Sequence, residues 1–284
     1  MEIRINGQIA DIVLDSEKTV GDILAGFEQW LANSGYRLSG LVLDGETTDT
    51  GSMEAAFGRD VDSVQTLDIF TSSLADLATQ GLAHICRDIE EYESLGFDGK
   101  QKYFEKWSES PQARFTGEQM PELFALCKKT FSDGDLSPRM LHAITEERLR
   151  ELDDPAGELA ALEPLVNEVC VRLEDLPLDI QTGKDGRAAQ TVQIFSNIAE
   201  KIFRIFNALK AEGPAADEIK IEQIGLAGFI AEFSTVVKDM MAAFQQHDTV
   251  LVGDLAEYEL APRLRTLYGA IVKMPREPAA VNGS

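Results

Sequence analysis

The pattern of apolar side chains changes once along this chain, near residue 73, and this change limits the possible folds more than any other feature. In the strand-like segments up to Phe70, apolar and polar residues alternate, as in strands with one buried face. From Ser73 onward, apolar residues recur every three to four positions, as in helices with one buried face. We therefore expect an α+β protein in which a small sheet domain (residues 1–72) precedes a larger all-helical domain (residues 73–274).

The first 72 residues predict two hairpin strands, one helix and two further strands. The Asn6–Gly7 pair is a favoured two-residue hairpin turn. Thr19, with Asp22 three residues later, is a helix N-cap signal, and Gly35 offers a left-handed C-cap where the helix should stop. The predicted strands are residues 1–5, 9–15, 38–43 and 64–70, with an irregular stretch between the last two.

The opening MEIRINGQ, the helical TVGDILAGFEQWLANSG, the third strand LSGLVLDGE and the last strand TLDIF together resemble a ubiquitin-like β-grasp domain over about 72 residues. The resemblance implies a protein-binding module, because β-grasp domains act mostly in recognition. Some relatives carry sulfur or are conjugated through a C-terminal Gly-Gly. Here the last strand runs into Thr71 and a long further chain without a terminal diglycine, so the carrier and modifier roles are not supported.

Charge restricts the partners. The chain has 49 acidic and 26 basic residues, a net charge of −23, and residues 1–72 alone have 13 acidic and 4 basic residues, a net charge of −9. Such a field repels phosphate backbones and anionic lipids, so we expect neither nucleic acid nor membrane as a partner. A protein with a basic surface is favoured electrostatically, although an acidic face is equally typical of ordinary solubilising surface. The start of the chain is unlike a signal peptide and no stretch is long and apolar enough to span a bilayer, so we expect a cytoplasmic protein.

The helical remainder predicts an antiparallel bundle followed by a disordered tail (residues 275–284). Pro164 and Pro262 should bend or restart the helices that contain them. The broad apolar stripes would allow a homodimer or a bound partner helix. Residues 248–264 also look like stretches of uncharacterised bacterial helical proteins, which implies no activity. The predicted long helices cover residues 156–176, 188–211, 217–246 and 249–274.

Residues 97–119 predict a short helix and loops, because Gly99, Pro111 and Gly117 interrupt the pattern. The aromatic residues in this stretch, Tyr103 and Trp107 among them, suit either a small satellite core or the wall of a ligand pocket.

No catalytic, cofactor or metal motif is complete in this sequence. Residues 182–186 resemble a phosphate loop, but Leu178 stands where the pattern requires glycine and Asp185 where it requires Ser or Thr. Residues 133–137 open like a calcium loop, but Pro138 stands where glycine is required. We therefore expect no cofactor and no metal, and we assign no catalytic residue.

Two further clusters are better explained by structure than by chemistry. Glu257 and Glu259 flank Tyr258 but are two residues apart, so they cannot share a helix face and a two-metal site is disfavoured. No histidine stands at a metal-ligand spacing from another ligand. The cysteines are few and widely spaced, which favours reduced, buried thiols: Cys86, Cys127 and Cys170.

Two functions remain. The first is a non-catalytic cytoplasmic adaptor, in which the β-grasp domain recognises a protein and the helical domain dimerises or holds a partner helix. The alternative is a small-ligand binder or enzyme with a pocket between the β-grasp and helical domains, near Tyr103, Trp107 and the Gly183–Lys184 turn. The candidate interaction or pocket residues are Tyr103, Trp107, Gly183, Lys184 and Tyr258.

Overall fold

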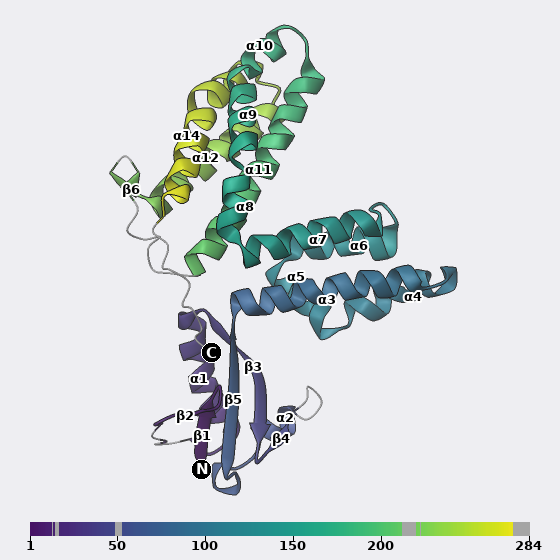
Figure 1. Ribbon diagram of the computed structural model, residues 1–284, viewed down its shortest axis with the longest axis vertical. Coiled ribbons are helices and arrows are strands. Elements are labelled where there is room, and N and C mark those ends of the chain that lie inside the picture. Colours follow the sequence, from purple (N-terminus) through teal and green to yellow (C-terminus); the bar gives the residue numbers. More distant parts are fainter. Residues whose placement is uncertain (13, 15–16, 49–52, 212–219, 222, 275–284) are drawn as a thin grey trace. The chain divides into compact units, whose positions relative to one another are not determined.

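A computed structural model describes the chain except for residues 13, 15–16, 49–52, 212–219, 222 and 275–284. It is an α+β protein: a mixed β-sheet with one helix, similar to a β-grasp, is followed by a mostly helical region (Figure 1). By its contacts the chain divides into two compact units, Met1–His142 and Ala143–Ser284. The predicted fold class is confirmed, whereas the predicted domain boundary near residue 72 stays a prediction.

The sheet region (residues 1–73) has five strands in the order β2-β1-β5-β3-β4, with β1 parallel to β5 and the other neighbours antiparallel. One face of the sheet packs against α1, whose Ile23 and Leu24 are buried with Ile3, Leu67 and Ile69 of the strands. The elements are β1 (Glu2–Ile5), β2 (Gln8–Ile9), α1 (Val20–Ser34), β3 (Tyr36–Leu43), β4 (Glu46–Thr47), α2 (Met53–Phe57), a 3₁₀ turn (Val61–Ser63) and β5 (Thr66–Ser73).

The local signals in this region act as predicted. Asn6 and Gly7 both have positive φ, 49° and 80°, as the hairpin turn requires. Thr19 and Asp22 form a complete capping box, and Gly35 ends α1 with a φ of 76°. These features depend on neighbouring residues alone, so the sequence determines them.

Two predictions here are wrong. The second hairpin strand ends at Ile9 instead of continuing to residue 15, and the stretch predicted to be irregular contains β4 and α2. Both strands concerned have two residues, which is too short for alternation to be recognised.

The helices of the first unit begin without a linker, because Ser73 is both the last residue of β5 and the N-cap of α3. Residues 97–119 form two helices, which corrects the prediction of one short helix and loops. Pro111 occupies the first turn of the second of them, where proline is tolerated, and Ser110 caps it. The helices that follow the sheet are α3 (Leu74–Ser94), α4 (Phe97–Ser108), α5 (Pro111–Gln119), α6 (Pro121–Lys128), a π-helix (Lys129–Asp133) and α7 (Pro138–Asp153). The last of these, α7, runs through the point where the two units divide.

The second unit is built around one apolar core in which α9, α11, α12 and α14 contribute most of the buried residues (Figure 1). Its elements are α8 (Pro155–Ala161), α9 (Glu163–Glu174), α10 (Leu176–Gln181), α11 (Asp185–Ala211), β6 (Lys220–Ile221), β7 (Ile224–Gly225), α12 (Leu226–Gln245), α13 (Thr249–Asp254), a π-helix (Leu255–Leu260) and α14 (Ala261–Val272).

Helix boundaries in this unit differ from the prediction in two places. The helix predicted for residues 217–246 begins only at Leu226, after a short hairpin of β6 and β7. The helix predicted for residues 249–274 consists of α13, a short π-helix and α14, and Pro262 lies in the first turn of α14. The predicted restart at Pro164 is confirmed by the division between α8 and α9. The predicted disordered tail lies outside the described residues.

Candidate functional site

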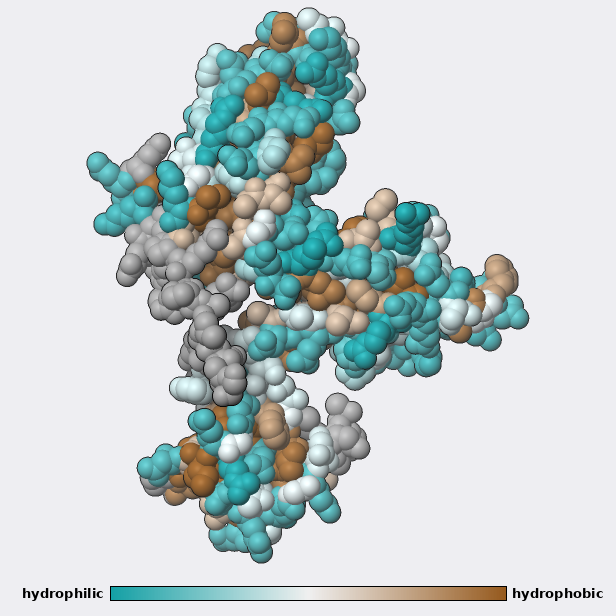
Figure 2. All heavy atoms as spheres, in the orientation of Figure 1, coloured by the Kyte–Doolittle hydropathy of each residue, from teal (hydrophilic) through white to brown (hydrophobic). Residues whose placement is uncertain are grey.

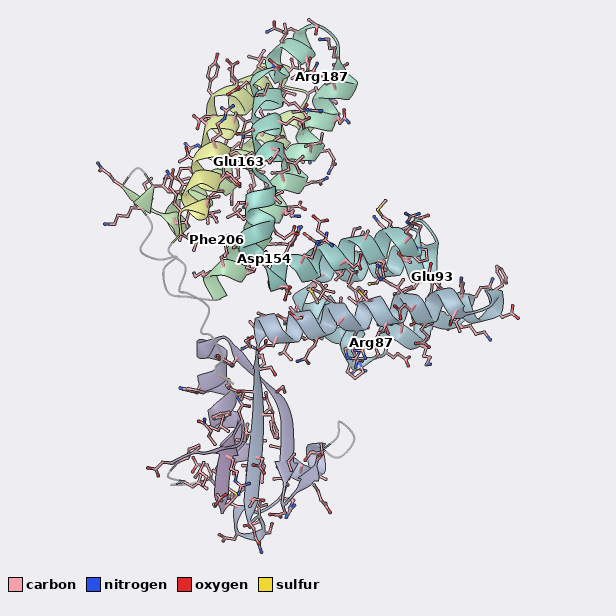
Figure 3. The ribbon with its side chains drawn as sticks, viewed as in Figure 1. Arg87, Glu93, Asp154, Glu163, Arg187 and Phe206 are labelled. Carbon is pink, nitrogen blue, oxygen red and sulfur yellow. The ribbon has the colours of Figure 1, made fainter. Side chains whose placement is uncertain are left out.

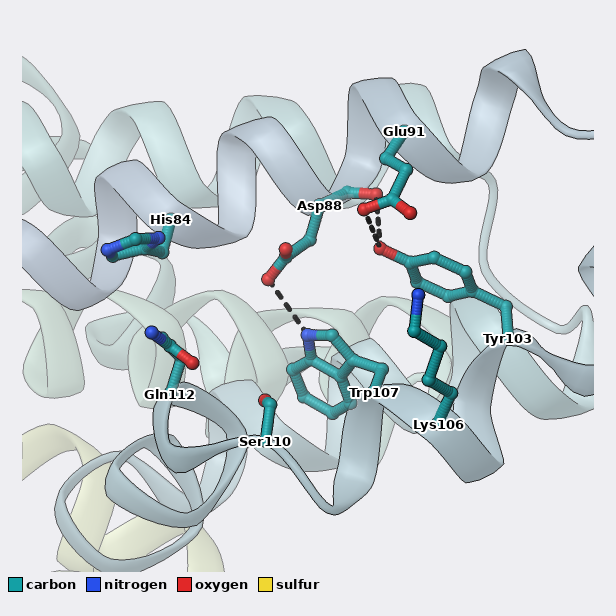
Figure 4. A pocket seen from close by; sticks show the side chains of 8 residues that line it. All are labelled: His84, Asp88, Glu91, Tyr103, Lys106, Trp107, Ser110 and Gln112. Atoms are coloured by element: carbon teal, nitrogen blue, oxygen red, sulfur yellow. Dashed lines mark hydrogen bonds between the residues drawn. The ribbon is translucent and has the colours of Figure 1, made fainter. Parts of the chain in front are cut away.

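A cavity of about 270 Å³ lies in the first unit and is called here the α3–α4 cavity (Figure 4). His84, Asp88 and Glu91 are spaced by four and three residues, so they share one face of α3. The opposite wall comes from the end of α4 and the start of α5. The lining residues are His84, Asp88, Glu91, Tyr103, Lys106, Trp107, Ser110 and Gln112.

Asp88 is the central polar group of this cavity. The Trp107 indole donates a hydrogen bond from Nε1 to Oδ2 of Asp88 at 2.8 Å. The Tyr103 hydroxyl lies 3.1 Å from the Asp88 carbonyl oxygen and 3.4 Å from Oε2 of Glu91, and it can donate to either. Burial raises the pKa of Asp88, and the indole hydrogen bond opposes this shift.

Tyr103 and Trp107 belong both to an aromatic cluster and to the lining of the cavity. Their rings are buried in an aromatic cluster, with Phe131 at 5.2 and 5.4 Å from the two ring centroids and Phe124 stacked on Trp107 at 5.5 Å. Their polar ends reach the cavity (Figure 4). Burial, with the charges of Asp88 and Glu91, raises the pKa of Tyr103, so its hydroxyl stays a donor at neutral pH.

Gly183 and Lys184 lie in the second unit, in the turn between α10 and α11. Gly183 has a φ of 72°, which glycine accepts without strain. Lys184 lies 3.4 Å from the buried carboxylate of Asp179, and Arg187 lies 2.9 Å from the same carboxylate. Figure 3 labels Arg187 near the start of α11. The positive charge of the turn therefore balances a buried acid. That this turn shares a pocket with Tyr103 and Trp107 stays a prediction.

A second cavity, of about 330 Å³, lies in the second unit. It is mostly apolar and has a few polar residues among its lining, but neither Gly183 nor Lys184 lines it. Tyr258 does not line this cavity either. It is 64% exposed on the π-helix before α14. The lining residues are Ile180, Asp185, Ala188, Ala189, Phe244, His247, Thr249 and Val252.

The acids around Tyr258 have structural roles. Asp248 caps α13, accepting a hydrogen bond from the Leu251 amide at 3.1 Å, and Glu259 pairs with Arg263 at 2.9 Å. In the part of the chain that the structure describes, no three His, Cys, Asp or Glu side chains are grouped so as to hold a metal ion. Nor does any helix there combine the length and apolarity that crossing a membrane would require.

Two of the three thiols, those of Cys127 and Cys170, are protonated at neutral pH. Burial raises the pKa of Cys127 to about 12 and that of Cys170 to about 11, so neither is an activated nucleophile.

A buried ionic network in the second unit was not predicted. Glu151 of α7 accepts hydrogen bonds from Nε and Nη2 of Arg204 at 2.8 and 2.9 Å. Nζ of Lys201 lies 2.6 Å from Glu147 and 2.9 Å from Glu158, and the bond to Lys201 holds the pKa of Glu158 below its usual range. The one available signal was that Lys201 and Arg204 stand among the apolar residues of the second half of α11.

The sheet face opposite α1, called here the open sheet face, carries a row of paired residues across all five strands. Paired positions share a face, and the neighbouring residues along the strands form the core on the other side. The row is Ile9, Arg4, Asp68, Val42 and Thr47.

Apolar side chains are exposed on this face. Figure 2 shows brown, hydrophobic atoms at the surface of the sheet region. Ile9 is 72% exposed. Phe70 is 41% exposed and lies over Gly40, whose missing side chain leaves room for the ring. Arg4 is held by Glu2 at 2.6 Å and faces Asp68 at 3.8 Å, so these three charges sum to −1. The face therefore combines exposed apolar groups with a small excess of negative charge.

Comparison with known proteins finds similar sequences, but the descriptions of the matches name no activity. Residues 1–73 match the model of the TP0873 N-terminal domain, and residues 159–269 match a domain of unknown function, DUF8042. The chain is 21% identical over 274 residues to an uncharacterized protein of Treponema pallidum (strain Nichols), a match that covers 96% of this chain and 98% of that protein. No solved structure matches significantly. The chain is thus similar over nearly its whole length to one bacterial protein, and its two matched regions are the sheet region and most of the second unit.

Proposed function

We propose that this protein is a non-catalytic interaction protein of the cytoplasm and that it binds another protein through the open sheet face. The observation that carries the proposal is the exposure of Ile9 and Phe70 on one face of a five-stranded sheet. Large apolar side chains exposed together are typical of protein-binding surfaces. The resemblance to β-grasp domains, which act mostly in recognition, supports the same function.

Charge indicates the chemistry of the partner. The sheet region has a strong excess of acidic residues, and Glu2 and Asp68 flank the apolar groups of the open sheet face while they neutralise Arg4. The complementary partner presents an apolar side chain with lysine or arginine beside it, and its association should weaken as salt rises.

Site-specific photo-crosslinking in living cells tests this proposal. A photo-reactive amino acid replaces Ile9 or Phe70, and Phe97, which is 76% exposed at the start of α4, serves as the matched control position. We expect one and the same protein to be crosslinked from positions 9 and 70 but not from 97, through a segment that contains basic residues. Ile9→Ser and Phe70→Ser should reduce binding of that protein, and Phe97→Ser should not.

Three results would contradict the proposal: no product, equal products from all three positions, or crosslinks to a second copy of this chain alone. The last would assign the open sheet face to a homodimer.

A second candidate function, binding of a small ligand, is favoured by one observation. The half-buried carboxylate of Asp88 lies at the α3–α4 cavity.

A further inference from the structure

Asp88 has an unusual set of partners for a half-buried acid. Its side-chain hydrogen bond comes from Trp107, whose indole is a neutral donor. Among the described residues, no lysine or arginine forms a salt bridge with Asp88. Buried charges are normally paired, since an unpaired carboxylate loses hydration without gaining a counter-charge. The cavity thus holds a negative charge that a ligand could balance.

His84 and Arg87 lie near enough to lower the pKa of Asp88, but in the described part of the chain neither forms an ion pair with its carboxylate. Glu91 adds a second carboxylate on the same face of α3. Arg87 is directed to His84, with Nη2 at 3.0 Å from Nδ1. Because a guanidinium only donates, Nδ1 of His84 is the acceptor in this contact. Lys106 lines the cavity but is exposed, and in the described part of the chain its ammonium pairs with no carboxylate.

The shape and walls of the cavity select the kind of cation. A volume of about 270 Å³ is near the lower limit for small-molecule sites, so the ligand is small. Tyr103 and Trp107 turn their polar edges to the cavity, where the hydroxyl and the indole N–H bond to Asp88, so the attraction for a cation comes from the Asp88 and Glu91 carboxylates. We propose that the α3–α4 cavity binds an alkylammonium group, held by the Asp88 and Glu91 carboxylates beside Trp107. The ammonium could belong to a free diamine or to a lysine side chain of a partner.

The two tryptophans of the chain supply a direct readout. In a ¹⁵N-labelled full-length protein, Trp30 and Trp107 give two indole N–H signals, and only that of Trp107 comes from a group bonded to Asp88. The probes are 1,5-diaminopentane, a lysine residue blocked at both ends, and 1,5-pentanediol as the neutral control. We expect the two amines, or one of them, to shift the Trp107 signal in a saturable way while the Trp30 signal stays fixed.

Matched variants distinguish amine binding at the cavity from a general effect of the protein's negative charge. Asp88→Asn keeps an oxygen that can accept from Trp107 but removes the charge, and it should weaken amine binding by about tenfold or more. Glu90→Gln removes the same charge from an exposed position of α3 outside the cavity lining and should change affinity less than about twofold. Lys106→Met removes a competing ammonium and should strengthen binding.

The inference is overturned if neither amine shifts the Trp107 signal, if the diol shifts it equally, or if Asp88→Asn and Glu90→Gln have the same effect. A response to the diamine alone assigns a free small molecule, and a response to the blocked lysine alone assigns a partner's side chain. Neither outcome depends on crosslinking at positions 9 and 70, so this inference and the proposed function can fail separately.

Discussion

His247 ends α12 with a φ of 57°, a left-handed conformation that glycine adopts without strain and other residues adopt at a cost. Its amide donates to the Phe244 carbonyl at 3.2 Å, so the backbone geometry of the helix end is well defined. The single residue thus holds local strain where α12 turns toward α13. Its side chain also lines the second cavity.

We expect His247→Gly to stabilise the second unit by about 0.5–1 kcal/mol, since the relief of strain exceeds the extra chain entropy that glycine loses on folding. The measurement is the free energy of unfolding from thermal or urea denaturation. Gln246→Gly is the control: Gln246 is right-handed at φ −82°, so glycine there should destabilise. A loss of stability in His247→Gly would show that the imidazole makes contacts worth more than the strain.

Residue-scale features divide into those that the sequence predicts and those that it does not. The Asn6–Gly7 turn and the Thr19 cap were predicted because each depends on residues within three positions. Trp107 was singled out as an aromatic wall residue, but its partner Asp88 was not, because the two are 19 residues apart and meet only when α3 and α4 pack.

At the scale of elements, α7 and α11 are joined by charge. The Glu151 side chain is 2% exposed, and both its oxygens accept from Arg204. Removing one partner of such a pair leaves the other charge buried without a counter-charge. This lowers the free energy of unfolding strongly.

Glu151→Ala should lower the free energy of unfolding of the second unit by about 3 kcal/mol. Glu168→Ala is the matched control, because Glu168 pairs with Arg172 on an exposed helix surface, where loss of the pair should cost less than about 1 kcal/mol. Calorimetry on both variants measures the difference. Equal effects would show that the α7–α11 network is no more important than a surface pair.

The errors in the predicted helices have two causes. Proline and glycine were taken as helix breaks in residues 97–119, whereas Gly99 and Pro111 lie in the first turns of α4 and α5, where they are tolerated. The start of α12 was placed too early because Ile221 and Ile224 suit a helix stripe and a short hairpin equally well.

For the whole molecule, the division into two units has a spectroscopic consequence. Both tryptophans, Trp30 and Trp107, lie in the first unit, so tryptophan fluorescence reports the unfolding of that unit alone. We expect calorimetry to resolve two transitions, of which fluorescence follows one and circular dichroism both. The Glu151→Ala substitution should lower the transition that fluorescence does not follow. Coincident transitions by all three methods would mean that the chain unfolds as one unit.

At this scale the sequence predicted the α+β class, because one change of side-chain period separates the sheet from the helices. It could not predict that the division of contacts falls at residue 142, inside α7, since a continuous helix shows no change of pattern where its neighbours change.

Phe70 lies in β5 and Asp88 lies in α3. Because β5 ends at Ser73, which is also the N-cap of α3, both residues lie on one uninterrupted stretch of regular backbone. A protein docked on the sheet and an amine held by the helix would therefore act on one continuous stretch of regular backbone, with no irregular residues between strand and helix. If either event alters the affinity for the other, thermodynamic linkage requires the reverse effect to have equal size.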